Sequence, residues 1–401
     1  DIAVMHPLAD MWSIHGPQRD PFPRLLYPNY QYKVWEAIHK NGNGCDYTCE
    51  SIIRKSRVEN GYLKYGNLRY NTLILLEVET IQHETAKILA KFVASGGKLI
   101  FVAKEPHKSP GLVNHNKNDL KVANTISKIK KSYPNRTFTV NAPNDDVLTW
   151  FRGIQKQCGI NPYIVIDKPD NAVSQIRHKT QGKDIFFISN ASQTDTYKLN
   201  LQFPQSNGSP QEWNPETGER KPLPAEKTIH VELPPATSKL IIFDDSPASP
   251  LIGAAPEYSR NTGTLTLKGW TMRLEHIDGT SRTMEIDTPF DLSKDESTRS
   301  FAGYIYYEKK LGNLPDYKYL DLGEVYGVSE VSVDGTEIGN RWYGRHRYRL
   351  VENASGKTLK IKISTTVGNY LLSKPENHAH GWVRRNGLSK TGIAGEIKLT
   401  Y

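Results

Sequence analysis

The stretch from Tyr319 to Leu350 constrains the fold more than any other part of this chain. Apolar residues recur at nearly even spacing from Leu320 to Val333, with polar residues between them, and Asp334-Gly335 follows directly. This alternation is typical of a strand with one buried face, and Asp-Gly supplies the positive φ angles of a two-residue turn. The stretch therefore predicts an antiparallel hairpin, with Gly339 where the returning strand bends away.

The first part of the chain alternates between strand and helix patterns. Ile2–Met5, Asn71–Leu76 and Lys98–Ala103 are short apolar runs that predict buried parallel strands, while Tyr30–Lys40 and Ile81–Val93 have apolar residues at helical spacing. Strands alternating with helices imply a parallel, doubly wound sheet. We expect this α/β domain to span residues 1–160.

Three further segments complete this domain. We expect residues 45–55 to form a helix, residues 63–70 a small hairpin and residues 137–140 a strand between two later helices. No glycine-rich phosphate loop follows any of the predicted strands, and the turn after the first strand, His6-Pro7-Leu8-Ala9-Asp10, contains no glycine. We therefore expect no nucleotide and no other cofactor.

The pattern changes after Tyr163. Short strand-like runs at hairpin spacing predict a small antiparallel β domain over residues 161–246. The segment Asp245–Pro256 contains three prolines and is the best linker in the chain. A β-sandwich is expected over residues 257–401.

The predicted hairpin also resembles a known family. LDLGEVYGVSEVSVDGTEIGNRW (residues 320–342) resembles the core hairpin of the galactose-binding-like jelly-roll sandwich in family 2 glycosidases and in bacterial α-L-rhamnosidases of family 106. Phe301–Tyr307 resembles the opening strand of that domain, and Thr365–Leu372 and residues 387–397 resemble its last strands. The resemblance implies an accessory domain beside a catalytic barrel.

The α/β part resembles a second domain of such enzymes. Residues 70–102, YNTLILLEVETIQHETAKILAKFVASGGKLIFV, resemble the glutaminase-like, flavodoxin-type domain that follows the barrel, and residues 178–190, HKTQGKDIFFISN, resemble the start of the β domain that comes next. True glutaminases have a nucleophilic cysteine at a strand-to-helix elbow, where this sequence has Glu77 or Lys104. The resemblance therefore implies no acyl-transfer chemistry.

Glycoside hydrolysis needs two carboxyl groups on rigid elements about 5 to 10 Å apart. Glu275 with Asp278, Asp321 with Glu324, and Glu376 are candidates, but each has an ordinary explanation in a turn, on a solvent-facing strand or in a polar loop. In the families resembled, both carboxylates come from a (β/α)8 barrel, and this chain has no eight-fold strand-helix repeat. Whether the chain is itself an enzyme stays open, but we expect no catalytic pair in it and a barrel upstream of Asp1.

Two clusters combine aromatic rings with arginine and histidine side chains, the residue types that bind sugars. They lie in residues 341–346, after the hairpin, and in residues 377–384, a loop that contains glycine and asparagine. The candidate sugar-binding residues are Arg341, Trp342, His346, His380, Trp382 and Arg384. The structural alternative is that Trp342 or Trp382 fills the domain core or packs against a neighbouring domain.

We expect no metal site. His378 and His380 are close in sequence but have no evident third ligand. Cys45 and Cys49 would share a helical face, which leaves a metal or redox pair as an alternative to ordinary buried thiols. The third cysteine, Cys158, is distant in sequence, and the chain has no disulfide framework.

Charge and hydropathy exclude other classes of partner. The 52 basic residues exceed the 43 acidic ones, but they are spread over many segments without a nucleic-acid-binding motif. No apolar run approaches the roughly 20 residues that span a bilayer. We expect neither a nucleic-acid partner nor a membrane span.

The resulting hypothesis is the accessory C-terminal portion of a secreted or periplasmic bacterial glycoside hydrolase similar to α-L-rhamnosidases. Its partners would be a plant or microbial polysaccharide or oligosaccharide and the upstream catalytic barrel of the same polypeptide. The alternative is a stand-alone carbohydrate-binding or scaffold protein without catalysis. A signal peptide is not evident at Asp1, and we expect the native chain to begin further upstream.

Overall fold

The structure is a computed structural model that describes residues 1–15, 27–180, 182–215, 218, 220–244, 263–312, 317, 319–350, 354–374 and 387–400. The chain forms two compact units. Unit 1 comprises Asp1–Pro234 and Ser238–Ile252, and unit 2 comprises Pro235–Thr237 and Gly253–Tyr401. A parallel sheet with helices and several antiparallel sheets make this a multidomain fold of α/β and all-β parts.

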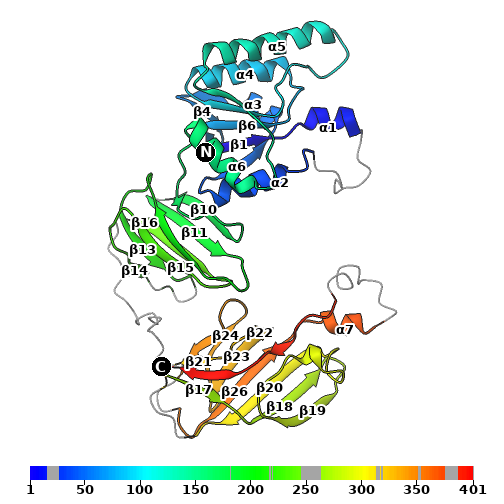
Figure 1. Cartoon of the computed structure of the whole chain (residues 1–401), viewed down its shortest axis with the longest axis vertical. Helices are drawn as coiled ribbons and strands as arrows, with labels where there is room; N and C mark the ends of the chain where they lie inside the picture. Colours follow the sequence, from blue (N-terminus) through cyan, green and yellow to red (C-terminus); the bar gives the residue numbers. More distant parts are fainter. Residues whose placement is uncertain are drawn as a thin grey trace. The chain divides into compact units, whose positions relative to one another are not determined.

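Unit 1 begins with a five-stranded parallel sheet in the order β2-β1-β6-β7-β8. Its strands are β1 (Ile2–Met5), β2 (Cys45–Thr48), β6 (Thr72–Leu76), β7 (Lys98–Val102) and β8 (Thr137–Val140). Its helices are α1 (Leu8–His15), α2 (Gln31–Lys40), α3 (Glu50–Lys55), α4 (His83–Ala94), α5 (His115–Ser132) and α6 (Val147–Cys158). In Figure 1, α4 and α5 lie on one side of the strands, and α2 and α6 lie on the other.

Both faces of this sheet are buried because helices cover both. Alternate residues of β6 point to opposite faces: Leu73 and Leu75 pack with residues of α3, α4 and α5, while Ile74 and Leu76 pack with residues of α2 and α6. Every residue of β6 is buried, as the unbroken apolar run predicts. The predicted strands and helices of this part are confirmed, except in residues 45–55.

Residues 45–55 are not one helix. Cys45–Thr48 form the edge strand β2, which pairs in parallel with β1, and only Glu50–Lys55 are helical. A cysteine spacing of four is compatible with a helix, but pairing with a strand more than 40 residues earlier decided the local structure. The predicted hairpin of residues 63–70 is confirmed as β4 (Tyr62–Tyr65) and β5 (Leu68–Tyr70), with β3 (Arg57–Glu59) as a third strand.

The remainder of unit 1 is a pair of antiparallel sheets. One has the order β10-β11-β16-β13-β14 and the other β15-β12-β9. The strands are β9 (Val165–Ile166), β10 (Val173–Thr180), β11 (Lys183–Asn190), β12 (Tyr197–Gln202), β13 (Ser209–Trp213), β14 (Arg220–Pro222), β15 (Ile229–Leu233) and β16 (Ser238–Asp244). Side chains of both sheets, among them Phe186 and Leu201, share one core.

Unit 2 is all-β apart from short helical turns. Its larger sheet has the order β19-β18-β20-β26-β23-β24, a second sheet the order β17-β28-β21-β25, and β22 pairs with β27. The strands are β17 (Thr264–Leu267), β18 (Trp270–His276), β19 (Ser281–Ile286), β20 (Gly303–Lys310), β21 (Tyr319–Asp321), β22 (Val325–Tyr326), β23 (Val328–Val333), β24 (Thr336–Arg341), β25 (Arg347–Arg349), β26 (Thr358–Ser364), β27 (Gly392–Ile393) and β28 (Ile397–Thr400).

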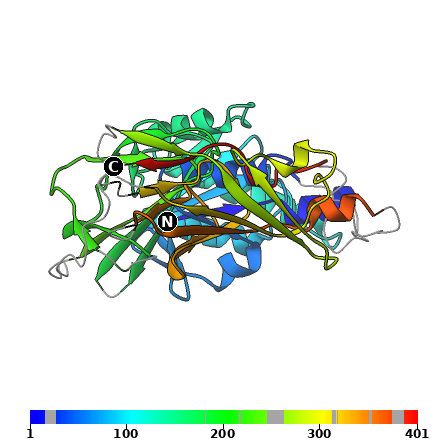
Figure 2. The same ribbon diagram turned by 90° about the horizontal axis from the view of Figure 1, so that it is seen from below.

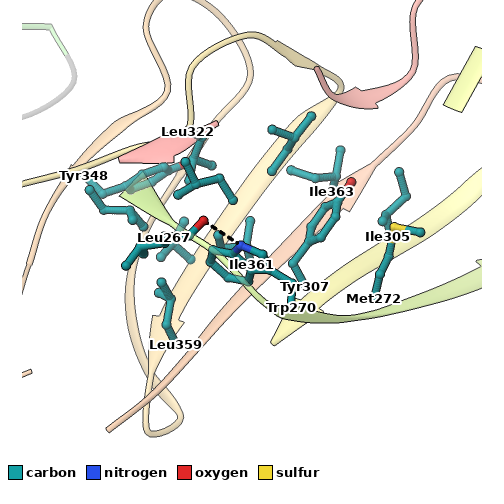
Figure 3. Close-up of a cluster of buried hydrophobic side chains, with 14 of the residues drawn as sticks. Leu267, Trp270, Met272, Ile305, Tyr307, Leu322, Tyr348, Leu359, Ile361 and Ile363 are labelled. Atoms are coloured by element: carbon teal, nitrogen blue, oxygen red, sulfur yellow. Dashed lines mark hydrogen bonds between the residues drawn. The ribbon is translucent and has the colours of Figure 1, made fainter. Parts of the chain in front are cut away.

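One hydrophobic core joins the two main sheets of unit 2. Figure 3 shows Trp270, Tyr307 and Ile361 within it, and the indole Nε1 of Trp270 donates to the carbonyl oxygen of Leu267 at 3.2 Å. Burial of large apolar side chains of this kind stabilises such a domain by about 1.5 to 3 kcal/mol each. The same strands turn their other side chains outward.

The central hairpin is confirmed in detail. Asp334 and Gly335 have φ angles of 46° and 79° between β23 and β24, as a tight two-residue turn requires. The pairing shifts register beside Val331, opposite Gly339, which has a φ of 154°. The predicted bend is therefore a β-bulge.

The expectation for Thr365–Leu372 was wrong. It resembled a strand, but Gly368–Leu372 form the short helix α7, and the strand β26 ends before it at Ser364. Both views place α7 at one end of the strands of unit 2 (Figures 1 and 2). Thr365 instead links the end of β26 to the start of β20, because its hydroxyl accepts a hydrogen bond from the Gly303 amide at 2.8 Å.

Candidate functional site

The loop after β24 positions an exposed aromatic pair. Trp342 is 71% exposed, and its ring contacts that of Tyr343 edge to face, with centroids 4.7 Å apart. Trp342 is therefore not a core plug of unit 2. An exposed indole can stack on an apolar ligand face.

The arginines of this loop are held by neighbouring groups. Arg341 Nε donates to the carbonyl oxygen of Arg347 at 3.0 Å, and its guanidinium lies 6.0 Å from the centroid of the Tyr348 ring. Arg345 forms an ion pair with the buried carboxylate of Asp321. These contacts fix the two ends of the segment that bears Trp342.

His346 lies inside the domain and not on its surface. It is 4% exposed, and its Nδ1 is 2.5 Å from Ser329 Oγ, which is also 2.5 Å from the Tyr348 hydroxyl. Burial, reinforced by the charge of Arg341, lowers the pKa of His346 to about 4. A neutral, buried imidazole holds the loop in place but is not open to a sugar at the surface. Sequence spacing missed its partner Ser329, which lies on another strand.

The other three candidates, His380, Trp382 and Arg384, lie outside the described residues. Glu376, named as a candidate carboxylate, also lies outside them. Their role in sugar binding stays a prediction.

The described candidate carboxylates of unit 2 have partners that favour the charged form. Glu275 pairs with Arg273, and the pKa of Asp278 is lowered by hydrogen bonds from Thr280. Hydrogen bonds from Tyr326 and Lys390 lower the pKa of Glu324. A general acid needs a raised pKa, and in the described parts of the chain every carboxyl group with a clear pKa shift is shifted downward.

The carboxyl edge of the parallel sheet has a second group of charged side chains. Ligands of open α/β sheets bind at this edge. Glu77 directly follows β6 with a φ of 50°, a strained angle for a residue other than glycine, and its carboxylate accepts from the Tyr30 hydroxyl at 2.7 Å. Lys104, after β7, lies 2.7 Å from Glu79, and hydrogen bonds from Lys104 and Lys108 lower the pKa of Glu79 to about 2.

Glu77 therefore has a positive φ at the end of β6, where the resemblance places the cysteine of true glutaminases. An open cavity of about 590 Å³ adjoins this edge between the loop after β7 and α5, but its Glu105 is already bound by Lys130 and Thr139. The sequence indicated Glu77 or Lys104 at this edge, whereas the partner Tyr30 could not be anticipated.

Cys45 and Cys49 do not share a helical face. Cys45 is buried in β2, and burial raises the pKa of its thiol, whereas Cys49 precedes α3. Among the residues that the structure describes, no group of three or more histidine, cysteine, aspartate or glutamate side chains could hold a metal ion. Over the same residues, no helix is long and apolar enough to cross a membrane.

Residues 35–227 match the family model described as alpha-L-rhamnosidase. This region, just under half of the chain, is therefore similar to α-L-rhamnosidases. A rhamnosidase from Novosphingobium sp. PP1Y is similar in structure over 100% of this chain, with a TM-score of 0.65 and 19% identity, and the chain spans 39% of its length. At that identity the similarity concerns the fold alone.

A sequence relative carries a different name. A protein of Formosa agariphila named "Putative beta-glucuronidase" is 26% identical over 191 residues, which are 44% of this chain and 14% of that protein. The matched residues 35–227 include Glu77 and Lys104 of the charged edge, whereas the Trp342 loop lies outside them.

Proposed function

We propose that this chain is the accessory, non-catalytic portion of a polysaccharide-degrading α-L-rhamnosidase, secreted or periplasmic, whose catalytic barrel lies upstream in the same polypeptide. The observation that supports this most is the family match over residues 35–227. The chain spans 39% of the length of the similar rhamnosidase, which leaves room for a barrel elsewhere in a protein of that size.

In this proposal the chain has three domains: a flavodoxin-like domain of residues 1–160, a small antiparallel β domain of residues 161–246 and a jelly-roll sandwich of residues 257–401. Trp342 stacks on a sugar ring at the loop tip, and Arg341 donates to its hydroxyl groups, while His346 acts only by holding the loop. His380, Trp382 and Arg384 bind the same glycan.

Rhamnose release tests this proposal. The 401-residue chain alone should release no rhamnose from an aryl α-L-rhamnoside, and the longer polypeptide that includes the upstream region should release it. Glu275→Gln in the longer protein should leave turnover unchanged, because Glu275 is paired with Arg273. Turnover by the 401-residue chain that Glu275→Gln abolishes would contradict the proposal. Glycan binding without rhamnose release by either protein would favour a stand-alone binding protein.

A further inference from the structure

The outward face of the larger sheet in unit 2 presents an ordered set of side chains, which we call the tyrosine face. It consists of Arg273, Glu275, Tyr304, Tyr306, Glu308, Glu330, Lys360 and Lys362. The residues between them on the same strands, such as Ile305 and Ile361, point into the core (Figure 3). Period-two alternation therefore places the whole set on one surface.

Strand register aligns this set in rows. Arg273, Tyr306, Lys362 and Glu330 are direct neighbours across four strands, and Tyr304 lies in the next row. Tyr304 is 46% exposed, and the centroids of the two tyrosine rings are 6.5 Å apart. Two rings at this spacing form a short aromatic track along the sheet.

Cations hold the rings in place. The Arg273 guanidinium lies over the Tyr306 ring at 4.1 Å, and the Lys362 ammonium lies over the Tyr304 ring at 4.7 Å. A ring that is already ordered loses little conformational entropy when a ligand binds it. The two tyrosines lie in adjacent rows of one strand, so their rings are neighbours on the same face.

The charges of the face balance one another. Arg273 pairs with Glu275, Lys362 with Glu330 at 2.9 Å and Lys360 with Glu308 at 3.1 Å. Three cations facing three carboxylates give no net charge, so the face does not attract an acidic or a basic polymer. It offers charge-assisted donors and acceptors beside apolar rings, which complements a ligand with many hydroxyl groups and C–H faces.

We propose that the tyrosine face binds an uncharged stretch of polysaccharide chain, with sugar rings on Tyr304 and Tyr306. The surface is one face of an open six-stranded sheet, which suits an internal segment of a chain better than a terminal sugar. This site is distinct from the Trp342 loop, and it rests on the proposed function in that the enzyme acts on glycans.

Affinity electrophoresis of the 401-residue chain tests the proposal. The probes are three neutral polysaccharides, α-L-rhamnan, galactomannan and xyloglucan, with polygalacturonate as an acidic comparison. We expect at least one neutral polymer to retard the chain, and Tyr304→Thr/Tyr306→Thr to weaken that binding at least ten-fold. Threonine keeps strand propensity, so the sheet is retained. Tyr304→Phe/Tyr306→Phe keeps both rings and should bind within about two-fold of the native chain.

Tyr32→Ala is the matched control, because Tyr32 is 45% exposed but lies on α2 in unit 1. It should leave binding unchanged. No retardation by any neutral polymer, undiminished binding by a folded double threonine variant, or stronger binding to polygalacturonate would overturn the proposal. An aryl α-L-rhamnoside is too small to span the face, so its turnover by the longer polypeptide tests the proposed function separately. If the longer polypeptide binds the polymer but does not hydrolyse the aryl rhamnoside, the proposed function is contradicted and the tyrosine-face proposal stands.

Discussion

The side-chain amide of Gln175 on β10 donates to the carbonyl oxygen of Asn43, in the loop after α2, at 2.8 Å. The same Nε2 donates to the carbonyl oxygen of His39 at 3.0 Å, and Gln175 is 3% exposed. This contact joins the α/β part of unit 1 to its β part through buried backbone groups. Such groups are costly to leave without partners, so the two parts of unit 1 are expected to unfold together.

Gln175→Leu should destabilise unit 1 by about 2 to 3 kcal/mol, because two buried carbonyl oxygens lose their donor. Urea unfolding followed by the circular dichroism of the helices measures this. The control is Gln202→Leu, whose Nε2 donates only to the Thr228 hydroxyl at 3.3 Å and should cost less than about 1 kcal/mol. Equal effects of the two substitutions would contradict a coupling role for Gln175.

Gly42→Ala should destabilise the same junction by about 3 kcal/mol or prevent folding. Gly42 has a φ of +88°, and a Cβ there would lie 1.8 Å from the carbonyl oxygen of Ile164. Gly66 has a φ of +57° but open space around an added Cβ, so Gly66→Ala should cost only about 1 kcal/mol. Both glycines have a positive φ, so backbone strain contributes to both substitutions. The difference between the two losses of unfolding free energy therefore measures the cost of the contact with Ile164.

The stability of unit 2 should fall in acid through His346. Its folded pKa is about 4, below the ordinary value of 6.5, because burial disfavours the charged ring. The unfolded chain therefore binds a proton first, and stability present above pH 6.5 is lost progressively as the pH falls toward 4, by at most about 3 kcal/mol. Calorimetry should show a smaller loss over this window in His346→Gln. An identical loss in both proteins would exclude His346 as the titrating group.

Two tryptophans of unit 2 should respond in opposite ways to truncation. Trp342 is 71% exposed and Trp270 is 1% exposed. Trp342→Ala should change the free energy of unfolding by less than about 0.5 kcal/mol while weakening glycan binding at the loop. Trp270→Ala should cost about 3 to 5 kcal/mol, because it empties the core. A large drop in melting temperature for Trp342→Ala would place this side chain in a structural role instead.

Local pattern determined much of this fold. The unbroken run of β6 allowed only a strand buried on both faces, and Asp334-Gly335 allowed the positive φ angles of a tight turn. Both signals act between residues near one another in sequence. The exposed position of Trp342 could not be read this way, because a tryptophan after a hairpin fits a core plug as well as a loop tip.

The tertiary structure decided what depends on distant partners. Cys45–Thr48 became a strand because β1 offered it a free edge, and His346 became a buried, neutral side chain because Ser329 and Tyr348 lie beside it. The strand β13 contains Pro210 and polar residues without alternation, and its place comes from pairing with β16. A sequence specifies propensities over a few residues, whereas burial and hydrogen-bond partners are set by the packing of segments far apart in the chain.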